Sequence, residues 1–506
     1  MSRRAAAAVA AALLAVVAVP FFVATTFHGD DYLFRAYARW SPQPFAAFVS
    51  DAHGGEYYRP LPMLAWWLLG RPGWGSAPCA ALAFLLHGGA AALTTALLRA
   101  LGRPPLVAAG AGVLMLIAPQ NLDAASWFAA STDLFATVFV LASLTAAARG
   151  RVAIAAAAAL AAYLSKESAY VLPLLAALVL RQQPWRRRLA VLVPQLALLA
   201  VVLAARTVLL QGGGGSGDAR ASVGVKLLQI AGGLAHVFTG DGVVPEPLAF
   251  GLGTAVFALA AFAVFRGRRA AGGEGGRWLP FAFCGVAAVP LLAAGWAVGA
   301  RYFYLPAVGL VWAAAEALAG AGPAARATIA AVLMLLGGVQ GAQRRADVVS
   351  HDRRVAAARR TIAAGLASGH RVFHVMSQVK DLDLALKEEP ALAAAADHLL
   401  VLSDVPASFV VIPKELAGAA APLVARPPIP PSGAYRFGPA RVVGLVRRGD
   451  EPSLSEVVQL FPEIRFIRLF RVASGQIVAR DVTDETRGAL EREEEGLDGD
   501  RTGGQD

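Results

Sequence analysis

Long apolar runs separated by short polar segments fill the first two thirds of the chain and predict membrane-spanning helices. A spanning helix needs about 20 mostly apolar residues. About eleven segments approach this length, although several are short or rich in alanine: 5–27, 78–100, 104–119, 126–148, 151–164, 168–181, 189–210, 247–265, 279–298, 302–320 and 324–342. The first resembles a signal peptide, but no clear cleavage site follows it, so we interpret it as a retained helix. Residues 1–342 are therefore predicted to form a polytopic all-α membrane domain.

The pattern changes after residue 343. Residues 344–367 read as an exposed helix rich in arginine and alanine. Short β-type runs follow, namely RVFHVM, HLLVLSD, SFVVIP and RVVGLVRR, with a helical pattern in DLDLALKEEPALAAAAD and a possible hairpin in FPEIRFIRLFRVASGQIVARDV. Alternating strands and helices predict a small soluble α/β domain over 343–484. The charged, glycine-rich tail 485–506 is predicted to be disordered.

Composition excludes several classes of protein. The chain has 506 residues, of which 57% are hydrophobic and 16% charged, whereas about a quarter of a soluble domain is charged. Soluble globular, disordered and disulfide-stapled proteins are therefore excluded. Cys79 and Cys284 lie in apolar runs and read as small buried hydrophobes. The net charge of +11 arises before residue 343, where 24 basic residues face 12 acidic ones. These basic residues lie between apolar runs, which indicates membrane topology and argues against nucleic acid as a partner.

The charges also predict an orientation. If the N-terminus is cytoplasmic, the short cytoplasmic loops are rich in arginine, as the positive-inside rule requires: Arg3, Arg4, Arg103, Arg149, Arg151, Arg181, Arg186, Arg187, Arg188, Arg266, Arg268, Arg269, Arg277 and Arg326. Ten of the twelve acids then lie near the outer ends, and Glu274 and Glu316 are the exceptions. We expect a protein of the inner (plasma) membrane with an outward-facing, carboxylate-lined site. Eleven spans place the C-terminal domain in the periplasm, although the arginines between 344 and 360 favour the other side.

The first outer loop, about 28–77, carries the first candidate residues. Asp30 and Asp31 are adjacent at the end of the first span. Two neighbouring carboxylates repel each other, so one is expected to have a raised pKa, as a general base needs. The alternative is a pair of solvated loop acids. Arg59, which precedes Pro60, either pairs with a phosphate or anchors the loop.

Further candidates follow along the predicted outer face. Asp133 is placed two turns into a spanning helix, where a carboxylate needs a cavity or a partner. Lys166 and Glu167 lie at a helix junction, where Lys166 pairs with Glu167 or Asp133, or binds an anionic head group. Arg301 is either an interfacial anchor or part of a cationic phosphate cradle with Arg59 and Lys166. The glycine-rich 211–246 loop is a linker or a lid.

No cofactor is required by the sequence, and the presence of a metal stays open. His28, His53 and His236 are predicted to lie on the outer side with the acids, but their spacing is not that of a metal site. First-turn carboxylates could instead recruit a divalent cation, Mg²⁺ or Mn²⁺, together with a substrate phosphate.

Five short blocks in this order resemble a known family. They are GDD at 29–31, YRPL at 58–61, PQNLDAA from Pro119 with Asp133 behind it, LSKE at 164–167, and RYFYLP at 301–306. Together they resemble the polyprenyl-phosphate-sugar-dependent glycosyltransferases of the GT-C fold, and most of all the protein O-mannosyltransferase branch, glycosyltransferase family 39. The resemblance covers about 5–342 and leaves out the remainder.

The resemblance implies a function and a set of partners. A sugar is transferred from a polyprenyl-phosphate donor at the outer leaflet to a hydroxyl of a protein, lipid or glycan acceptor. Asp30 is then the general base, and Asp31 orients it or holds a cation. The donor phosphate and substrate would be bound by Tyr58, Arg59, Asp123, Asp133, Lys166, Glu167 and Arg301. Attack opposite the leaving phosphate inverts the anomeric carbon.

Two other functions remain open. A transporter or flippase of lipid-linked glycans would place ionisable residues near the membrane midplane in both halves, often at broken helices. Here the acids gather at one predicted face, and only Glu316 fits that pattern. A non-catalytic membrane scaffold predicts that Asp30→Asn leaves function intact.

Overall fold

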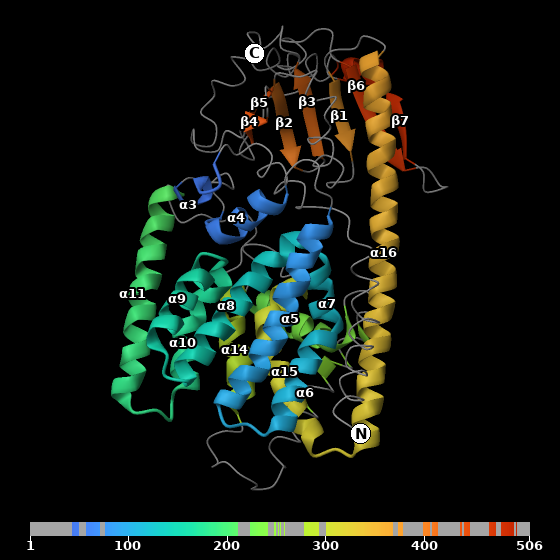
Figure 1. Cartoon of the computed structure of the whole chain (residues 1–506). Coiled ribbons are helices and arrows are strands. Elements are labelled where there is room, and N and C mark those ends of the chain that lie inside the picture. The colour runs from blue at the N-terminus through green and yellow to red at the C-terminus, as the bar shows by residue number, and fades with distance from the viewer. Residues whose placement is uncertain are drawn as a thin grey trace, which may run out of the picture. The chain divides into compact units, whose positions relative to one another are not determined.

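A computed structural model of the whole chain describes two compact units (Figure 1). The described residues are 43–49, 57–70, 76–210, 223–240, 247–248, 251, 253–254, 258, 278–292, 300–367, 373–377, 398–404, 407–412, 436–437, 440–445, 465–471, 477–489 and 492. The first unit comprises 1–26, 56–65 and 73–347, and the second comprises 27–55, 66–72 and 348–506. Asp30, Asp31 and the predicted 5–27 span lie outside the described residues.

The first unit is a helical bundle. Its helices and 3₁₀ turns are α5 (Ala77–Ala100), α6 (Pro105–Ile117), α7 (Pro119–Ser126), η1 (Phe128–Ala130), α8 (Ser131–Ala148), α9 (Val152–Tyr163), η2 (Glu167–Val171), α10 (Leu172–Val179), α11 (Trp185–Leu209), α12 (Val223–Thr239), α14 (Leu279–Leu292), η4 (Ala300–Phe303) and α15 (Tyr304–Ala319). Helices α4 (Pro60–Leu69) and α16 (Pro323–Ala367) continue into the second unit.

Four described helices are long and apolar enough to cross a membrane: Ala77–Ala100, Phe128–Ala148, Trp185–Leu209 and Pro323–Gln343. A fifth span is possible if the bent pair α6–α7 counts as one. Six shorter apolar helices of 10–17 residues accompany them. The chain is therefore mostly helical and apolar, and the expected total of about eleven spans stays a prediction.

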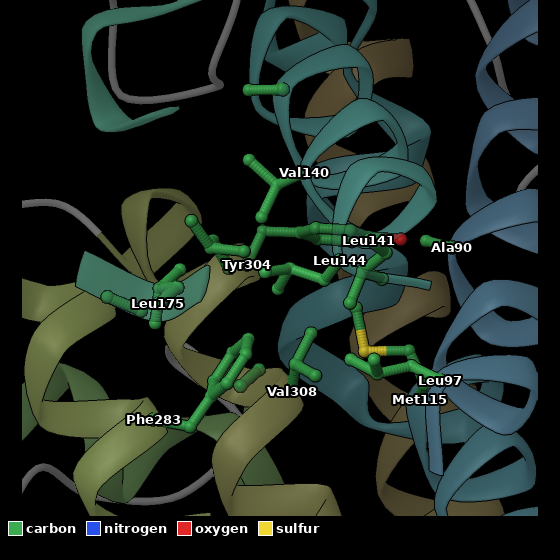
Figure 2. Packing of buried hydrophobic residues seen from close by; sticks show 14 of the residues in the cluster. Ala90, Leu97, Met115, Val140, Leu141, Leu144, Leu175, Phe283, Tyr304 and Val308 are labelled. Carbon is green, nitrogen blue, oxygen red and sulfur yellow. The ribbon is translucent and has the colours of Figure 1, made fainter. Parts of the chain in front are cut away.

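The bundle core consists of small and branched side chains that interlock between helices (Figure 2). Trp312, Tyr163 and Phe283 are among the largest side chains in it that are fully buried. Helices α14 and α15 approach closely because position 309 is glycine. A Cβ atom there would lie 2.5 Å from the carbonyl oxygen of Pro280 and 2.6 Å from the amide nitrogen of Cys284, and backbone atoms cannot move aside. Both cysteines are buried, as the sequence indicates.

A bend of 57° separates α6 from α7, and side chains satisfy the carbonyls that it releases. Pro119 has no N–H to donate to Met115, four residues earlier; the side-chain amide of Asn121 donates to this carbonyl instead, at 3.1 Å. His87 Nε2 lies 3.1 Å from the next carbonyl, Leu116 O. Since a carbonyl only accepts, Nε2 is the donor and Nδ1 accepts from the Tyr304 hydroxyl at 2.6 Å.

The sequence interpretation misses three local features of this unit. The segment expected as a loop at 119–126 is α7, which begins at Pro119, a favourable first helical residue. The 211–246 segment contains a 17-residue helix, α12, although it was predicted to be a lid or linker. Asp133 lies in the first turn of α8, because η1 separates the apolar run into two elements; it was expected two turns inside the helix.

The second unit contains a mixed seven-stranded sheet in the order β4-β5-β2-β3-β1-β6-β7. Its strands are β1 (Phe373–Ser377), β2 (His398–Asp404), β3 (Ala407–Ile412), β4 (Arg436–Phe437), β5 (Ala440–Leu445), β6 (Arg465–Arg471) and β7 (Ile477–Asp481). The β1–β6 and β2–β5 pairs are parallel and the others antiparallel. A short helix, α3 (Ala46–Val49), also belongs to this unit.

The strands fall where the sequence places them. The four predicted β-type runs overlap β1, β2, β3 and β5 to within one residue at the ends that extend beyond them, and β6 and β7 pair antiparallel within the predicted hairpin. The predicted helix at 381–397 lies outside the described residues. Residues 483–489 are helical, so regular structure continues past 485, where the tail was expected to begin. Whether this unit is soluble and which side of the membrane it occupies stay predictions.

Candidate functional site

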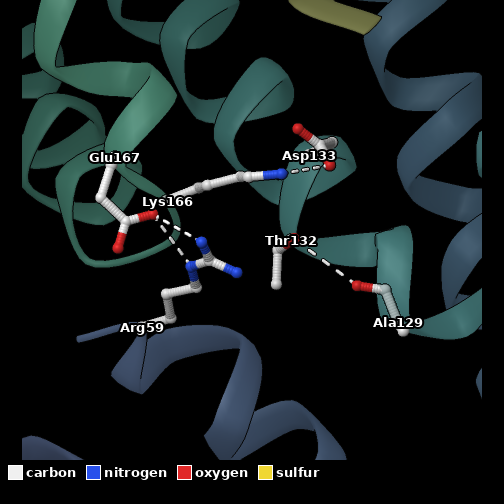
Figure 3. Close-up of polar contacts among 6 residues, drawn as sticks. All are labelled: Arg59, Ala129, Thr132, Asp133, Lys166 and Glu167. Atoms are coloured by element: carbon white, nitrogen blue, oxygen red, sulfur yellow. Dashed lines mark hydrogen bonds and ion pairs between the residues drawn. The ribbon is translucent and has the colours of Figure 1, made fainter. Parts of the chain in front are cut away.

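Two ion pairs lie together at one end of the helical bundle (Figure 3). Arg59 donates from Nε and Nη2 to the same oxygen of Glu167, Oε2, at 3.0 and 2.8 Å. Lys166 donates from Nζ to Asp133 Oδ2. These four residues, here called the paired cluster, come from segments up to 108 residues apart in the sequence.

Backbone geometry brings Arg59 to the Lys166–Glu167 junction. Arg59 immediately precedes α4, which begins at Pro60 because proline suits the first helical position. The amide of Leu61 then donates to the carbonyl of Leu164 at 3.1 Å, at the end of α9. This bond ties the start of α4 to the chain just before Lys166.

The backbone at the junction explains why Lys166 and Glu167 have different partners. Lys166 is extended, with φ −166° and ψ 151°, and Glu167 begins the 3₁₀ turn η2. Neighbouring side chains point to opposite sides where the backbone is extended. Lys166 therefore reaches α8, where Asp133 lies in the first turn and its carboxylate is favoured by the helix dipole. Glu167 reaches back to Arg59.

The two pairs are withdrawn from water to different degrees. The side chains of Lys166 and Asp133 are 7% and 5% exposed, and those of Arg59 and Glu167 are 11% and 22% exposed. Removing one partner of a buried pair leaves an uncompensated charge and costs about 3–5 kcal/mol. We infer that removing one partner destabilises the protein more at the Lys166–Asp133 pair than at the Arg59–Glu167 pair.

Burial and the neighbouring charges act in opposite directions on the two cations. Burial lowers the pKa of Lys166, and it outweighs the carboxylate of Asp133, which raises it. Burial also acts to lower the pKa of Arg59, but the carboxylate of Glu167 outweighs it, so the pKa of Arg59 is raised. Arg59 is therefore a fixed positive charge.

Aromatic rings cover both cations. The guanidinium carbon of Arg59 lies 4.0 Å from the ring centroid of Tyr57, and Nζ of Lys166 lies 4.5 Å from that of Tyr302. Such contacts stabilise desolvated cations by about 2 kcal/mol or more. Tyr302 belongs to η4, which places it beside Lys166 even though 136 residues separate them in sequence.

The structure thus brings together four of the residues that the sequence singles out: Arg59, Asp133, Lys166 and Glu167. It also decides between the alternatives for Lys166, which pairs with Asp133 and not with Glu167. Tyr58 is buried, at 6% exposure. Asp123 lies in α7 and Arg301 in η4, but their side chains are outside the described set.

Two residues near the cluster were missed by the sequence interpretation. Tyr302 lies in a recognised block, but only the arginine before it was singled out. Arg206, near the end of α11, acts electrostatically on both Glu167 and Tyr170. From sequence alone, an arginine near the end of an apolar run suggests a side chain that snorkels to the membrane surface. Its position beside Glu167 and Tyr170 follows only from the packing of α11.

The described residues contain no group of three or more histidine, cysteine, aspartate or glutamate side chains suited to hold a metal ion. Asp133 and Glu167 are each engaged by a cation, so neither is a bare carboxylate, as recruitment of a divalent cation would require. His236 contacts the carbonyl of Gly240 at 3.1 Å. Asp30, Asp31, His28 and His53, the other candidates for Mg²⁺ or Mn²⁺, lie outside the described residues.

The ion pairs leave hydrogen-bond donors for another group. An arginine side chain has five N–H bonds and a lysine ammonium three; Glu167 takes two of the former and Asp133 one of the latter. Glu167 and Asp133 therefore hold the two cations in place without using all their donors. The remaining N–H bonds suit an oxyanion with several acceptor atoms, such as a phosphate.

Comparison with known proteins gives limited similarity. No family model matches the chain, and no curated protein matches its sequence. Two crystal structures of ArnT from Cupriavidus metallidurans are similar in structure. The apo state has 15% identity and a TM-score of 0.49, over 80% of this chain and 98% of that one. The form bound to undecaprenyl phosphate has 16% identity and a TM-score of 0.48, over 75% and 84%. Both scores are too low to carry an inference.

Proposed function

We propose that this protein is a membrane glycosyltransferase that moves a sugar from a polyprenyl-phosphate donor to an acceptor hydroxyl. The acceptor is a protein, a lipid or a glycan, and the reaction takes place at the outer face of the inner membrane. The paired cluster binds the donor phosphate, and Asp30 is the general base.

One observation carries the proposal: segments from four of the five sequence blocks meet at a single place. Arg59 comes from YRPL, Asp133 follows the PQNLDAA block, Lys166 and Glu167 come from LSKE, and Tyr302 comes from RYFYLP. These segments are far apart in sequence, so packing of the bundle alone does not require their charged residues to meet. A shared site explains why each block contributes a charged or aromatic side chain.

The chemistry of the cluster fits a phosphate leaving group. Breaking the bond between the anomeric carbon and the phosphate oxygen leaves negative charge on the phosphate, and fixed N–H donors stabilise it without a general acid. The spare donors of Arg59 and Lys166 would perform this task. Glu167 and Asp133 would orient the two cations while the ligand binds.

The attacking group needs a base on the opposite face of the sugar ring. In the proposed reaction Asp30 takes the proton of the acceptor hydroxyl, whose oxygen then attacks the anomeric carbon in line. The carbon–phosphate-oxygen bond breaks, the polyprenyl phosphate departs with the electron pair, and the configuration inverts. Asp31 would orient Asp30.

A glycan comparison by mass spectrometry tests this proposal. Cells that lack the protein receive the wild type, Asp30→Asn or Arg59→Gln at equal membrane levels. Arg187→Gln is the matched control, because Arg187 also makes side-chain bonds, to Gln183 at 3.1 Å and to the Ala148 carbonyl at 3.3 Å, but lies at the other end of α8.

We expect a sugar that is missing from the null cells to return with the wild type and with Arg187→Gln, and not with the other two variants. The unused polyprenyl-phosphate sugar should then accumulate. Full restoration by both Asp30→Asn and Arg59→Gln would overturn the transferase in favour of a scaffold. Accumulation of the lipid-linked sugar on the cytoplasmic side alone would favour a flippase.

A further inference from the structure

Two neighbouring turns at the end of the bundle opposite the paired cluster carry exposed arginines, to which the function proposed above assigns nothing. The first turn joins α8 to α9 and is fixed by Gly150, whose φ is +77°. The amide of Gly150 donates to the Ala147 carbonyl at 2.9 Å. The amide of Arg151 donates to the Ala146 carbonyl at 2.8 Å; these two bonds form the motif that ends a helix at a left-handed glycine. Arg149 and Arg151 are left exposed on either side of this glycine.

Arg187 holds the second turn, between α10 and α11, against the first. Its Nη2 donates to the last carbonyl of α8, Ala148 O, at 3.3 Å, and its Nη1 donates to Gln183 at 3.1 Å. Glycine at position 150 permits this contact, because a Cβ atom there would lie 2.7 Å from Nη2 of Arg187. The two turns therefore lie side by side, and the second exposes Arg186 at the start of α11.

The exposed arginines of the two turns form a positively charged surface. We call Arg149, Arg151 and Arg186 the arginine patch. Among the residues that the structure describes, none of the three has an acidic partner. The sequence from 134 to 210 contains one acid, Glu167, which is engaged in the paired cluster at the other end of the bundle.

Two further acids do not cancel this charge. Glu316 lies at the same end of the bundle, but its Oε1 is 3.3 Å from Nη1 of Arg103, and Arg103 acts electrostatically on Arg181 in the second turn. Glu274 belongs to the segment 259–277, which is outside the described residues. By sequence this segment has four arginines against that one acid, a net charge of +3, so counting it does not reverse the sign.

An exposed apolar stripe begins beside the arginine patch. Trp185 is 65% exposed, and the guanidinium carbon of Arg186 lies 5.6 Å from its ring centroid. The residues that follow at positions i+4, i+8 and i+11 share one helix face with Trp185, and they are also exposed: Leu189 at 46%, Val193 at 59% and Leu196 at 52%. Helix α11 is long and apolar enough to cross a membrane. Arginine and tryptophan at the start of such a helix are typical of the head-group layer.

We propose that the arginine patch binds the head group of an anionic phospholipid in the leaflet at this end of the bundle. The three guanidinium groups would donate to the phosphate oxygens. Trp185 would lie at the boundary between head group and acyl chains, and one acyl chain would follow the stripe from Leu189 to Leu196.

The stripe is the reason to choose a lipid as the ligand. A free phosphate or a soluble acidic peptide would satisfy the arginines, but it would leave the apolar face of α11 uncovered. A phospholipid has an anionic and an apolar part in the same order along the helix as the patch and the stripe. This proposal does not depend on the transferase function.

Native mass spectrometry of the purified full chain tests the site. The protein is released from nanodiscs that contain equal amounts of phosphatidylglycerol and phosphatidylcholine, and the lipids that stay bound are counted. The main variant replaces the three arginines of the patch with glutamine. They are exposed and lack acidic partners among the described residues, so the fold should stay intact. Arg345→Gln is the matched control: the span Pro323–Gln343 begins shortly after α15 ends, on the side of the patch, and Arg345 is exposed just beyond its other end.

We expect the wild type and Arg345→Gln to retain phosphatidylglycerol in preference to phosphatidylcholine. Each arginine near an anionic lipid surface contributes about fivefold to affinity, so each single variant should lose about fivefold and the triple variant should lose the preference. If the triple variant does not fold, the single variants decide. Trp185→Ala should weaken the retention of phosphatidylglycerol without restoring that of phosphatidylcholine.

Three results would overturn the proposal. The first is equal retention of both lipids by the wild type. The second is a preference that the arginine variants keep, or that Arg345→Gln loses to the same extent. The third is thermal protection by inorganic phosphate as strong as that by phosphatidylglycerol, which would identify a free anion as the ligand.

Discussion

The charged side chains at the two ends of the helical bundle differ in how far they are shielded from water. At one end, the paired cluster matches two cations with two carboxylates, and the Lys166–Asp133 side chains are 7% and 5% exposed. At the other end, Arg103 pairs with Glu316, and their side chains are 21% and 16% exposed. Both groups contact α15 or the turn just before it, one near each end.

The difference shows what burial demands. A charged side chain that is almost completely shielded from water needs an oppositely charged partner, because its desolvation is costly without one. Where water reaches both side chains, an ion pair contributes less to stability, because solvent screens the charges. The Lys166–Asp133 pair therefore depends on its internal partner more than the partly exposed Arg103–Glu316 pair does.

Breaking the driest pair should have the largest effect. Lys166→Gln leaves the Asp133 carboxylate buried without its cation, and we expect unfolding to become easier by about 3–5 kcal/mol. The double variant Lys166→Gln with Asp133→Asn should recover most of this loss. Denaturant unfolding in detergent micelles measures it. If the two single effects simply add in the double variant, the pair is not the source of the stability.

The guanidinium group of Arg59 offers a more specific test of the paired cluster. Arg59→Lys keeps the charge but loses the two N–H bonds that converge on Glu167 Oε2, which an ammonium cannot reproduce. If Arg59 positions donors for the leaving phosphate, we expect the rate of sugar transfer to fall about 100-fold. A time course of the glycan product at matched protein levels measures this rate. Wild-type turnover in Arg59→Lys would contradict a positioning role for the fork.

The same kind of change should cost less at the other end. Glu316→Gln removes the charge that faces Arg103 but keeps an oxygen for the Trp312 N–H. Because both ionic side chains reach solvent, we expect a loss of about 1 kcal/mol in unfolding free energy. Denaturant unfolding in detergent micelles, as for Lys166→Gln, measures this loss. A loss as large as that of Lys166→Gln would remove the contrast between the two ends.

The smallest effect is expected at Tyr163, which is fully buried beside Tyr170 at the end of α9. Its hydroxyl has no hydrogen-bond partner among the described residues. Tyr163→Phe should therefore leave stability unchanged or raise it by up to about 1 kcal/mol. Thermal unfolding measures the difference. A clear destabilisation would mean that a group outside the described residues bonds to this hydroxyl.

The sequence predicts where the long helices lie, because a long apolar run has few alternatives in a membrane protein, but not where α8 begins or that α16 is one continuous helix. It does not predict α7, since the polar letters PQNLDAAS resemble a loop and only the preceding proline and the helix packing make them helical. In the second unit, the β-type runs locate the strands. The sheet order depends on pairings between distant strands, which no local pattern contains.

The candidate site was predictable as a list of residues but not as a set of pairs. Lys166 had two plausible acids, and the nearer one in sequence is the wrong one, because the extended backbone turns Glu167 to the opposite side. Arg206 could not be recognised, since its role depends on α11 passing Glu167 and Tyr170. Asp30 and Asp31 lie outside the described residues, so their role stays a prediction.

The contacts around the α6–α7 bend form a closed ring that passes through the site. His87 joins Tyr304 to the Leu116 carbonyl at the bend, and α7 leads from there toward Asp133. Asp133 holds Lys166, and Lys166 lies against Tyr302, two residues before Tyr304. Because these contacts form a closed loop, moving one of the residues would disturb the contacts of its neighbours in the loop. We expect the site to be preorganised, so that an arriving ligand spends little of its binding energy on rearranging the protein.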